Sequence, residues 1–540
     1  VDKVKLFADR FSLFPDASST QLVTAGAVAI APYTNQRPVN LGTSSVAGST
    51  SFTLGDLQRF NVNDLVVGRR DPASPQVGAG VVTVSAALAS DSLRVLNGLV
   101  LANTRQMTDQ GGVTGLSFKN VVLDAGGQVT FTGSGNSIQY LSGVIRDTAL
   151  ADNASFTMSS LLRTSTSTSA SLPLTIGEVF TDVAYATGKR FYQGITTQDG
   201  DIRIFADQLQ QTRVVGFLDT TSGGLYAAST AEVTLAPLTA GRGISIYSST
   251  PVTDTLGLRI GNPQAPGLEL VRAKSLVIGS GNLRNIQLAT PGFGYVAPPA
   301  VYVNGQSGIA EAVLERDGYQ INGVTYFQLA GIRISNPMGT YTSAPTITVA
   351  SPSSTGSSLP GSSSATATAT LGAAGAITLN SNLSYNYVQY PQAPFDVTLA
   401  TGSSITAQAA QLPPSNTSSI IAGGLRVLAG GAVQLAGVND VDELSAILTG
   451  SGSAANLSFA DSDFIRLGRV SVPGTLTITA AGAITQSSDG VTTGTGASFT
   501  TGAGAITLGS ANNSFSGSVS AVNTSGGITL VNSAALSLGT

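Results

Sequence analysis

The chain has 540 residues, of which only 10% are charged and 6% are aromatic, and its net charge is -4. It contains no Cys and no His, so it has no disulfide, no thiolate nucleophile, and neither the commonest general base nor the commonest transition-metal ligand. The acidic balance and the scattered Lys and Arg argue against nucleic acid as a partner, and no apolar run reaches the roughly 20 residues of a membrane span.

Val, Ile and Thr are spread along the whole sequence, whereas disordered chains contain few β-branched residues. We therefore expect a folded chain. Its start shows no charged segment followed by an apolar one, so no signal peptide is predicted, and its end falls within a repeated pattern. We expect the mature or excised part of a longer protein.

Residues 1–289 consist mainly of short alternating apolar and polar runs separated by Gly, Ser, Asn and Asp. This pattern predicts half-buried strands joined by turns. An excursion is expected near 145–200, where RTSTSTSASLP interrupts the alternation. Within it, GKRFYQG (188–194) combines two positive charges with two aromatic rings. A solvated hairpin tip is favoured there over a contact with a partner.

Residues 290–371 contain a repeat of a different length. TPGFGYVAPPAVYV (290–303) recurs as NPMGTYTSAPTITV (336–349), at an offset of 46 residues. Each copy is followed by an alternating run of small residues, and SPSSTGSSLPGSSS (351–364) is predicted to be a flexible loop. We predict a small two-copy β module inserted into the surrounding structure.

Residues 372–540 contain the clearest repeat. Gly482-Ala483-Ile484-Thr485 returns at Gly504 and, as Gly-Gly-Ile-Thr, at Gly526, each time after 22 residues. At about 3.3 Å per residue, such a repeat makes a loop of three short strands and three turns. Coils stacked about 4.8 Å apart place each Ile on the one below, and only stacking buries their apolar faces. We predict an all-β fold, a right-handed parallel β-helix (β-solenoid) of about 22 residues per coil.

About 450 residues in such coils correspond to roughly twenty coils and a rod on the order of 100 Å long. The last coil shows no polar cap. Its unpaired edge is therefore expected to pair with a further coil, either in the same polypeptide or in another copy.

Three segments resemble the passenger repeats of filamentous-haemagglutinin-like exoproteins: TSFTLGDLQRFNVNDLVVGR, NDVDELSAILTGSGSAANLSFADSDFIRLGRV and LTITAAGAITQ. These exoproteins are large bacterial surface proteins, often exported by two-partner secretion. The resemblance covers most of residues 1–289 and 372–540. It implies a secreted right-handed β-helix that works as an adhesin, a fibre or a matrix component.

One group of carboxylates is the best candidate for chemistry: Asp440, Asp442, Glu443, Asp461 and Asp463. Two pairs of them lie 21 residues apart, so stacking would bring Asp440 near Asp461 and Asp442 near Asp463, within about 5 Å. Such a cluster would suit Ca²⁺ or the paired acids of a glycoside hydrolase. The favoured interpretation is a set of turns, because Asp and Asn bond to nearby backbone. No catalytic, cofactor-binding or metal-binding residue is assigned.

The densest aromatic patch consists of Tyr385, Tyr387, Tyr390 and Phe395. If exposed, these rings would stack on sugars or anchor a neighbouring subunit. A loop that covers the solenoid is the favoured alternative.

These features predict a non-enzymatic, extracellular structural or adhesive protein, a rod-like segment of a large exoprotein at a bacterial cell surface. The alternative is a self-assembling subunit of a filament, sheath or surface layer, and a β-helical carbohydrate-active enzyme is a third hypothesis. The expected partners are further coils of the same protein, joined end to end, and a surface glycan or a host or cell-surface receptor. Neither nucleic acid, a membrane span, a metal nor a cofactor is expected.

Overall fold

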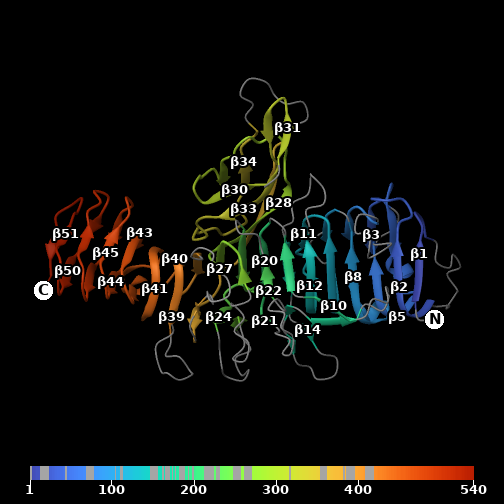
Figure 1. The fold of residues 1–540 in the computed structure, drawn as a ribbon, viewed down its shortest axis with the longest axis horizontal. Coiled ribbons are helices and arrows are strands. Elements are labelled where there is room, and N and C mark those ends of the chain that lie inside the picture. The colour runs from blue at the N-terminus through green and yellow to red at the C-terminus, as the bar shows by residue number, and fades with distance from the viewer. Residues whose placement is uncertain are drawn as a thin grey trace.

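The computed structural model describes residues 3–11, 23–42, 46–68, 78–103, 105–109, 114–145, 156–160, 163–164, 171–172, 174–176, 178–181, 189–192, 194–197, 200–211, 224–226, 231–246, 257–260, 271–315, 318–352, 362–380, 383–384, 396–407 and 419–539. These residues form an elongated all-β body with the two ends of the chain at opposite ends of it (Figure 1). A smaller group of strands projects sideways from its middle (Figure 1).

Most strands belong to three sets, and within each set successive strands pair in parallel along the body. The first set consists of β1 (Lys3–Phe7), β2 (Val23–Ala31), β5 (Phe60–Val67), β7 (Ala87–Ala89), β8 (Val95–Ala102), β10 (Gly115–Ala125), β12 (Ser137–Ile145), β16 (Leu174–Ile176), β19 (Gly194–Thr197), β21 (Leu209–Gln211), β22 (Gly224–Tyr226) and β26 (Val271–Arg272).

The second set continues from the first part of the chain to its end. It consists of β3 (Val39–Gly42), β4 (Thr50–Thr53), β6 (Val82–Val84), β9 (Met107–Asp109), β11 (Val129–Phe131), β13 (Phe156–Ser160), β20 (Ile202–Ala206), β23 (Glu232–Ala236), β27 (Ser275–Ser280), β37 (Leu383–Ser384), β38 (Asp396–Thr401), β40 (Ile420–Ala429), β41 (Val433–Leu448), β43 (Ile465–Val472), β45 (Ile484–Gln486), β46 (Val491–Thr493), β48 (Ile506–Leu508), β49 (Ser514–Phe515) and β51 (Ile528–Leu530).

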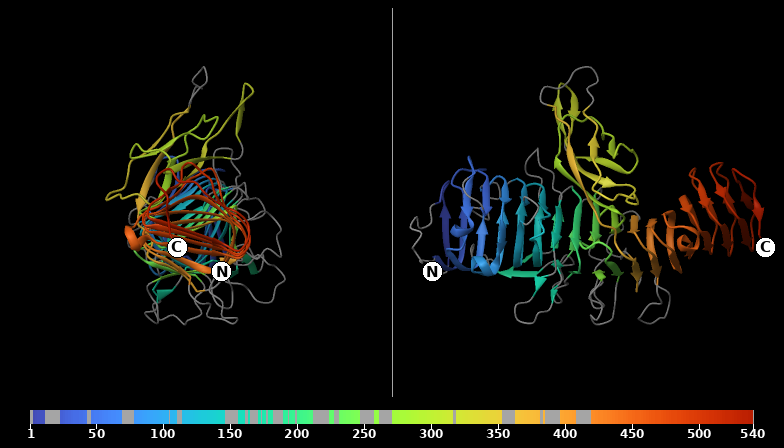
Figure 2. Two further views of the ribbon diagram at one scale, coloured as in Figure 1. Left: turned by 90° about the vertical axis from the view of Figure 1, so that its left-hand side faces the viewer. Right: turned by 180° about the vertical axis from the view of Figure 1, so that it is seen from behind.

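The third set shares β41 with the second. It consists of β24 (Gly243–Ile246), β25 (Gly257–Ile260), β36 (Ile377–Leu379), β39 (Ile405–Ala407), β42 (Leu457–Asp461), β44 (Thr475–Ala480), β47 (Gly496–Thr501), β50 (Ser518–Asn523) and β52 (Ser537–Leu538). Seen along the body, the strands of all three sets overlay on one cross-section (Figure 2).

The inward side chains of these strands form one continuous hydrophobic core that extends from Ala25 to Val519. The alternation of the sequence decides which side chains enter it. In β44, for example, Leu476, Ile478 and Ala480 are buried, while the residues between them are at least partly exposed. This strand thus buries one face fully, and the next strand along the body covers its edge.

The repeated Ile residues stack as the sequence predicts. Ile465 pairs with Ile484, Ile484 with Ile506, and Ile506 with Ile528. Elsewhere the spacing between paired residues changes: Leu425 pairs with Val397 on one side and with Leu444 on the other, and the first interval is the longer one. The mostly parallel pairing is consistent with a solenoid in which loops of different length leave the strands in register.

Several short elements lie outside these sets. Two antiparallel hairpins, β14 (Arg163–Thr164) with β15 (Ser171–Leu172) and β17 (Glu178–Thr181) with β18 (Lys189–Tyr192), occupy the predicted excursion. In the described part of the chain, the helical turns are α1 (Leu54–Leu57), α2 (Ser90–Leu93) and η3 (Gly452–Ala455). None of the helices in the described ranges has the length and apolar character of a membrane span.

The projecting strands, which we call the module, extend from residue 283 to residue 371. They are β28 (Leu283–Thr290), β29 (Val301–Val303), β30 (Ala310–Leu314), β31 (Tyr319–Ile321), β32 (Val324–Tyr326), β33 (Leu329–Ile334), β34 (Ile347–Val349) and β35 (Thr366–Leu371). All pair antiparallel, and their apolar side chains form a separate core around Ile286, Tyr295 and Ile332.

The two sequence copies of the module interlock instead of folding side by side. β29 of the first copy pairs with β34 of the second, β28 pairs with β35, and β30 pairs with β33. Two backbone bonds repeat at the offset of the sequence copies: the Leu283 N–H donates to the Pro337 carbonyl at 3.0 Å, and the Leu329 N–H donates to the Pro291 carbonyl at 3.2 Å. The copies are therefore related by a pseudo-twofold arrangement.

The parallel sets continue past the module without a break. β27 pairs directly with β38, so Leu276 lies beside Val397 although the whole module separates them in the chain. The module leaves the body after β27, and its base lies against the outer face of β20, β23 and β27 (Figures 1 and 2).

Candidate functional site

The carboxylates singled out by the sequence do not form a site. The strand register pairs Asn439, not Asp440, with Asp461. Because side chains alternate along a strand, this shift of one residue leaves Asp440 exposed and Asp461 buried. The predicted stacking of Asp440 on Asp461 is thus wrong, and no group of three or more Asp or Glu residues that would hold a metal occurs in the described part of the chain.

The backbone bonds of this group agree with the turn interpretation. Asp461 accepts from the backbone N–H groups of Val441 and Asp463, both at 3.1 Å. Asn439 accepts from the Ile420 N–H at 2.9 Å and donates to three carbonyls. These side chains satisfy backbone groups at a corner between the strand sets, which is a stabilising role.

Asp461 is expected to make the stability of the protein depend on pH. Burial, together with the neighbouring Asp463, raises its pKa from 3.8 to about 7. The folded state therefore holds a proton that the unfolded state releases, so stability falls as the pH rises from about 4 to 7. In Asp461→Asn we expect a melting temperature a few degrees above that of the wild type at pH 8 and nearly equal to it at pH 4. Equal melting temperatures at both pH values would contradict this assignment.

Two other predicted features lie wholly or partly outside the described residues. Tyr385, Tyr387, Tyr390 and Phe395 fall in 385–395, which the structure does not describe. In GKRFYQG, Lys189–Tyr192 forms β18, one arm of the second hairpin. This placement agrees with a hairpin.

The structure instead gathers charge in an open groove between the module and the body. The groove measures about 800 Å³ and follows β27, β38, β40, β41 and β43 on one side and β30 and β33 on the other. Half of its lining residues are charged, against 10% in the whole chain. They are Glu232, Lys274, Glu311, Arg333, Asp396, Arg426, Asp442, Glu443, Arg466, Arg469 and Asp489.

The groove includes two of the carboxylates that the sequence singled out, Asp442 and Glu443. Glu443 forms an ion pair with Arg466, which lies opposite it in the next strand. On the same ladder Asp396 is solvent-exposed, and partial desolvation by its neighbours raises the pKa of its carboxyl above the ordinary value. Charges of both signs thus lie along one outer face.

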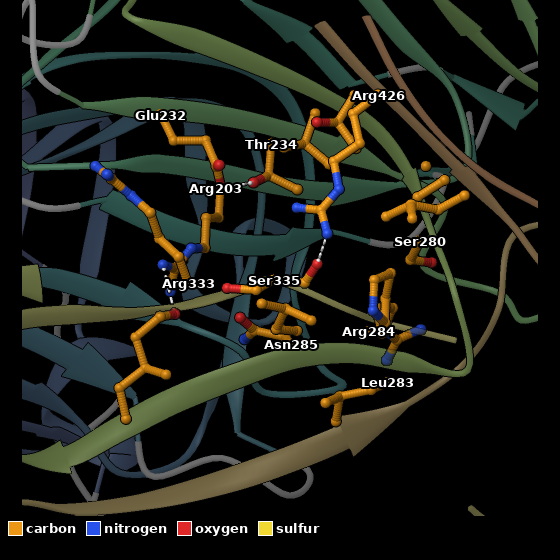
Figure 3. Close-up of a pocket in the computed structure, with 18 of the residues that line it drawn as sticks. Arg203, Glu232, Thr234, Ser280, Leu283, Arg284, Asn285, Arg333, Ser335 and Arg426 are labelled. Carbon is orange, nitrogen blue, oxygen red and sulfur yellow. Dashed lines mark hydrogen bonds between the residues drawn. The ribbon is translucent and has the colours of Figure 1, made fainter. Parts of the chain in front are cut away.

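A narrower cavity of about 110 Å³ opens at the base of the module and shares several lining residues with the groove. Four arginines line it: Arg203 and Arg426 from the body, and Arg284 and Arg333 from the module (Figure 3). Glu232 and Glu311 line it as well. Gly279 also borders it with φ of +88°, and a Cβ there would lie 2.1 Å from the Ala400 carbonyl oxygen, so no other residue fits.

Asp201 connects the module to the body at this point. Its carboxylate accepts from Arg333 of the module at 2.7 and 3.2 Å and from Arg203 of the body at 3.1 Å. It also accepts from the Glu232 N–H at 2.8 Å. Burial alone would raise the pKa of Asp201, but Arg203 and Arg333 outweigh burial and hold that pKa below its ordinary value.

Arg203 touches both copies of the module. Its guanidinium donates to the Ile332 carbonyl at 2.9 Å and to the Ile286 carbonyl at 3.5 Å. Ile286 and Ile332 are 46 residues apart, which is the offset of the two sequence copies, so Arg203 lies close to the pseudo-twofold axis. One side chain of the body thereby orients both halves of the module.

Arg284 and Arg426 are bound in a different way from Arg203 and Arg333. Arg426 donates to the Ser335 carbonyl and Arg284 donates to the Leu238 carbonyl, with the Arg284 guanidinium 5.7 Å from the centre of the Phe205 ring. Burial lowers the pKa of both guanidinium groups. Among the described residues, neither has a carboxylate oxygen within ion-pair distance.

Sequence reasoning missed this site because its residues come from strands far apart in the chain. Arg203 on β20 and Arg333 on β33, for example, bind the same carboxylate, although the first half of the module lies between these strands in the sequence. One signal for the site is present in the sequence. Arg203 is a charged residue within the otherwise apolar strand IRIFA, all of which is buried. Such a charge requires a partner, but the sequence does not say which one.

The parallel sets, the module and the repeats define the class: this is an all-β, repeat-containing protein. Within it, residues 454–522 match the DUF5649 family, which is described as repeats of unknown function. The matched segment extends from η3 into β50, along the part where the Gly-Ala-Ile-Thr repeats occur. No curated protein and no solved structure is significantly similar to the chain.

Proposed function

We propose that the chain is a rod-like segment of a secreted bacterial surface exoprotein with a structural or adhesive, non-enzymatic role. In this proposal the stacked strands form a right-handed parallel β-helix, and each Gly-Ala-Ile-Thr repeat contributes one coil. The observation that carries the proposal is the position of the module. It projects from the side of a long body, has its own core, and borders a groove rich in charge (Figures 1 and 2).

The division of roles follows from this geometry. The body supplies length and stiffness, because each strand is covered by the next along one continuous core. The module and its groove supply a surface for contact with a partner, since charged residues gathered on an exposed surface favour recognition over folding stability. The resemblance to filamentous-haemagglutinin-like repeats supports an extracellular location.

Electron microscopy of the purified chain across a dilution series tests this proposal. We expect separate rods on the order of 100 Å long, each with one lateral protrusion near the middle. Deletion of residues 283–371 provides the matched control, in which the rod persists and the protrusion disappears. Compact particles would contradict the rod.

The second candidate function is assembly of copies end to end. At the C-terminal end, Leu538 is 72% exposed, whereas Val519, which it stacks upon, is 1% exposed. A further coil would bury Leu538, whether it belongs to the same polypeptide or to another copy. Filaments that form at high concentration and are lost in Leu538→Asp would favour assembly. Separate rods at all concentrations would exclude it for this chain.

A further inference from the structure

The cavity at the base of the module has more positive than negative charge. Its four arginines face two lining carboxylates, Glu232 and Glu311, and the adjoining Asp201 already binds Arg203 and Arg333. Burial and the neighbouring Asp201 raise the pKa of Glu232 above its ordinary value, although Arg203 and Arg333 oppose this rise. The cavity therefore has an excess of fixed positive charge.

This excess is concentrated on two side chains. Arg284 and Arg426 each make one hydrogen bond to a carbonyl, and each guanidinium has five N–H donors. Asp207 lies near Arg284, and Glu232 and Glu311 lie near Arg426, but no described carboxylate is within ion-pair distance of either. Partly buried cations are ordinarily paired with a negative group. A negative group from outside the chain would therefore supply the missing partner for these two guanidinium groups.

The size of the cavity limits what this group can be. One water requires about 10–15 Å³ in this measure, so a cavity of about 110 Å³ accommodates a group several times larger than water. Thr234, Ser280, Asn285 and Ser335 also line the cavity and offer further polar atoms (Figure 3). An oxyanion with two or three accessible oxygens matches both the volume and the planar donors of arginine.

We propose that this cavity is a binding site for one oxyanion group, held between Arg284 of the module and Arg426 of the body. Because the two arginines come from different parts of the protein, the bound group also ties the module to the stacked strands. The cavity opens into the charged groove, so the oxyanion is either a free inorganic ion or the charged group of a small molecule whose remainder lies in the groove. This inference goes beyond the proposed function and does not depend on it.

Isothermal titration calorimetry with sodium sulfate at low ionic strength tests the proposal, because sulfate does not titrate between pH 5 and 8. We expect saturable binding at one site per chain. Arg284→Gln and Arg426→Gln should each weaken it about tenfold or more, since each removes one charged donor set. Arg37→Gln is the matched control: Arg37 also donates to a carbonyl, that of Ser49 at 3.3 Å, but lies outside the cavity, and this variant should bind like the wild type.

Parallel titrations with inorganic phosphate, glucuronate and glucose 1-phosphate distinguish the two sources of the group. Equal affinities for the free ions and the sugar derivatives indicate a free ion, and tighter binding of a sugar derivative indicates a group carried on a larger molecule. Failure of the wild type to bind any of the four ligands above a chloride control would overturn the proposal. Wild-type affinity in both glutamine variants would overturn it as well. Arg426→Lys, which retains the charge, should bind more tightly than Arg426→Gln, and this comparison separates loss of charge from loss of folding.

Discussion

Asp201→Asn is expected to detach the module from the body. The substitution removes a buried negative charge that binds Arg333 of the module and Arg203 of the body, so both guanidinium groups lose their ion pair with Asp201. Removing one partner of a buried ion pair typically lowers stability by about 3–5 kcal/mol. Because the hydrophobic core of the body is separate from that of the module, we expect this loss to fall on docking.

Limited proteolysis and urea denaturation measure this effect. In Asp201→Asn the module should be cut much faster than in the wild type, while the body unfolds at an unchanged urea concentration. The control is Glu443→Gln, which breaks the more exposed pair with Arg466 and should lower stability by no more than about 1 kcal/mol. If both variants were cut at the same rate, the role assigned to Asp201 would be wrong. Since its pKa lies below the ordinary value, the wild type should lose docking only as the pH falls below about 4.

Ile484→Ala is expected to cause the second large effect. Ile484 lies between Ile465 and Ile506 in the stack and has no exposed surface. Truncating a fully buried Ile to Ala leaves a cavity and lowers the free energy of unfolding by about 2–5 kcal/mol. Denaturation in urea, followed by far-ultraviolet circular dichroism, gives this value.

The repeat itself provides a matched control. Ile528 occupies the position equivalent to Ile484 two repeats later and is 45% exposed. Ile528→Ala removes the same atoms from a site with fewer neighbours, so its loss should be below about 1 kcal/mol. Equal losses in the two variants would show that burial in the stack is not what stabilises these residues.

The sequence was sufficient to predict the repeated strands but not the site. The alternation of apolar residues and the regular recurrence of Ile depend on local pattern, and both appear in the register from Ile484 to Ile528. The expected stacking of Asp440 on Asp461 failed because it required a spacing correct to a single residue. Asp461 pairs with Asn439 instead of the assumed Asp440, and side chains alternate at every residue.

The contacts of the module could not be predicted from the sequence, for a different reason. The offset between its sequence copies identifies two copies, but it does not say whether β29 pairs within its own copy or with β34 of the other. The docking residues add to this difficulty, because Asp201 binds Arg333, and Arg426 binds the Ser335 carbonyl, across long stretches of the chain. Such long-range pairing is set by three-dimensional packing and leaves no periodic trace in the sequence.

Because β27 pairs directly with β38, the module could be replaced by another segment without breaking the stacked strands. The chain leaves the body and returns to it through two adjacent strands, since Leu283 pairs with Leu371. The entropy needed to close a loop grows only with the logarithm of its length. A shorter turn or an unrelated domain at this junction would therefore leave the stacked strands almost equally stable. The segment inserted here can vary with little effect on the stability of the strands that carry it.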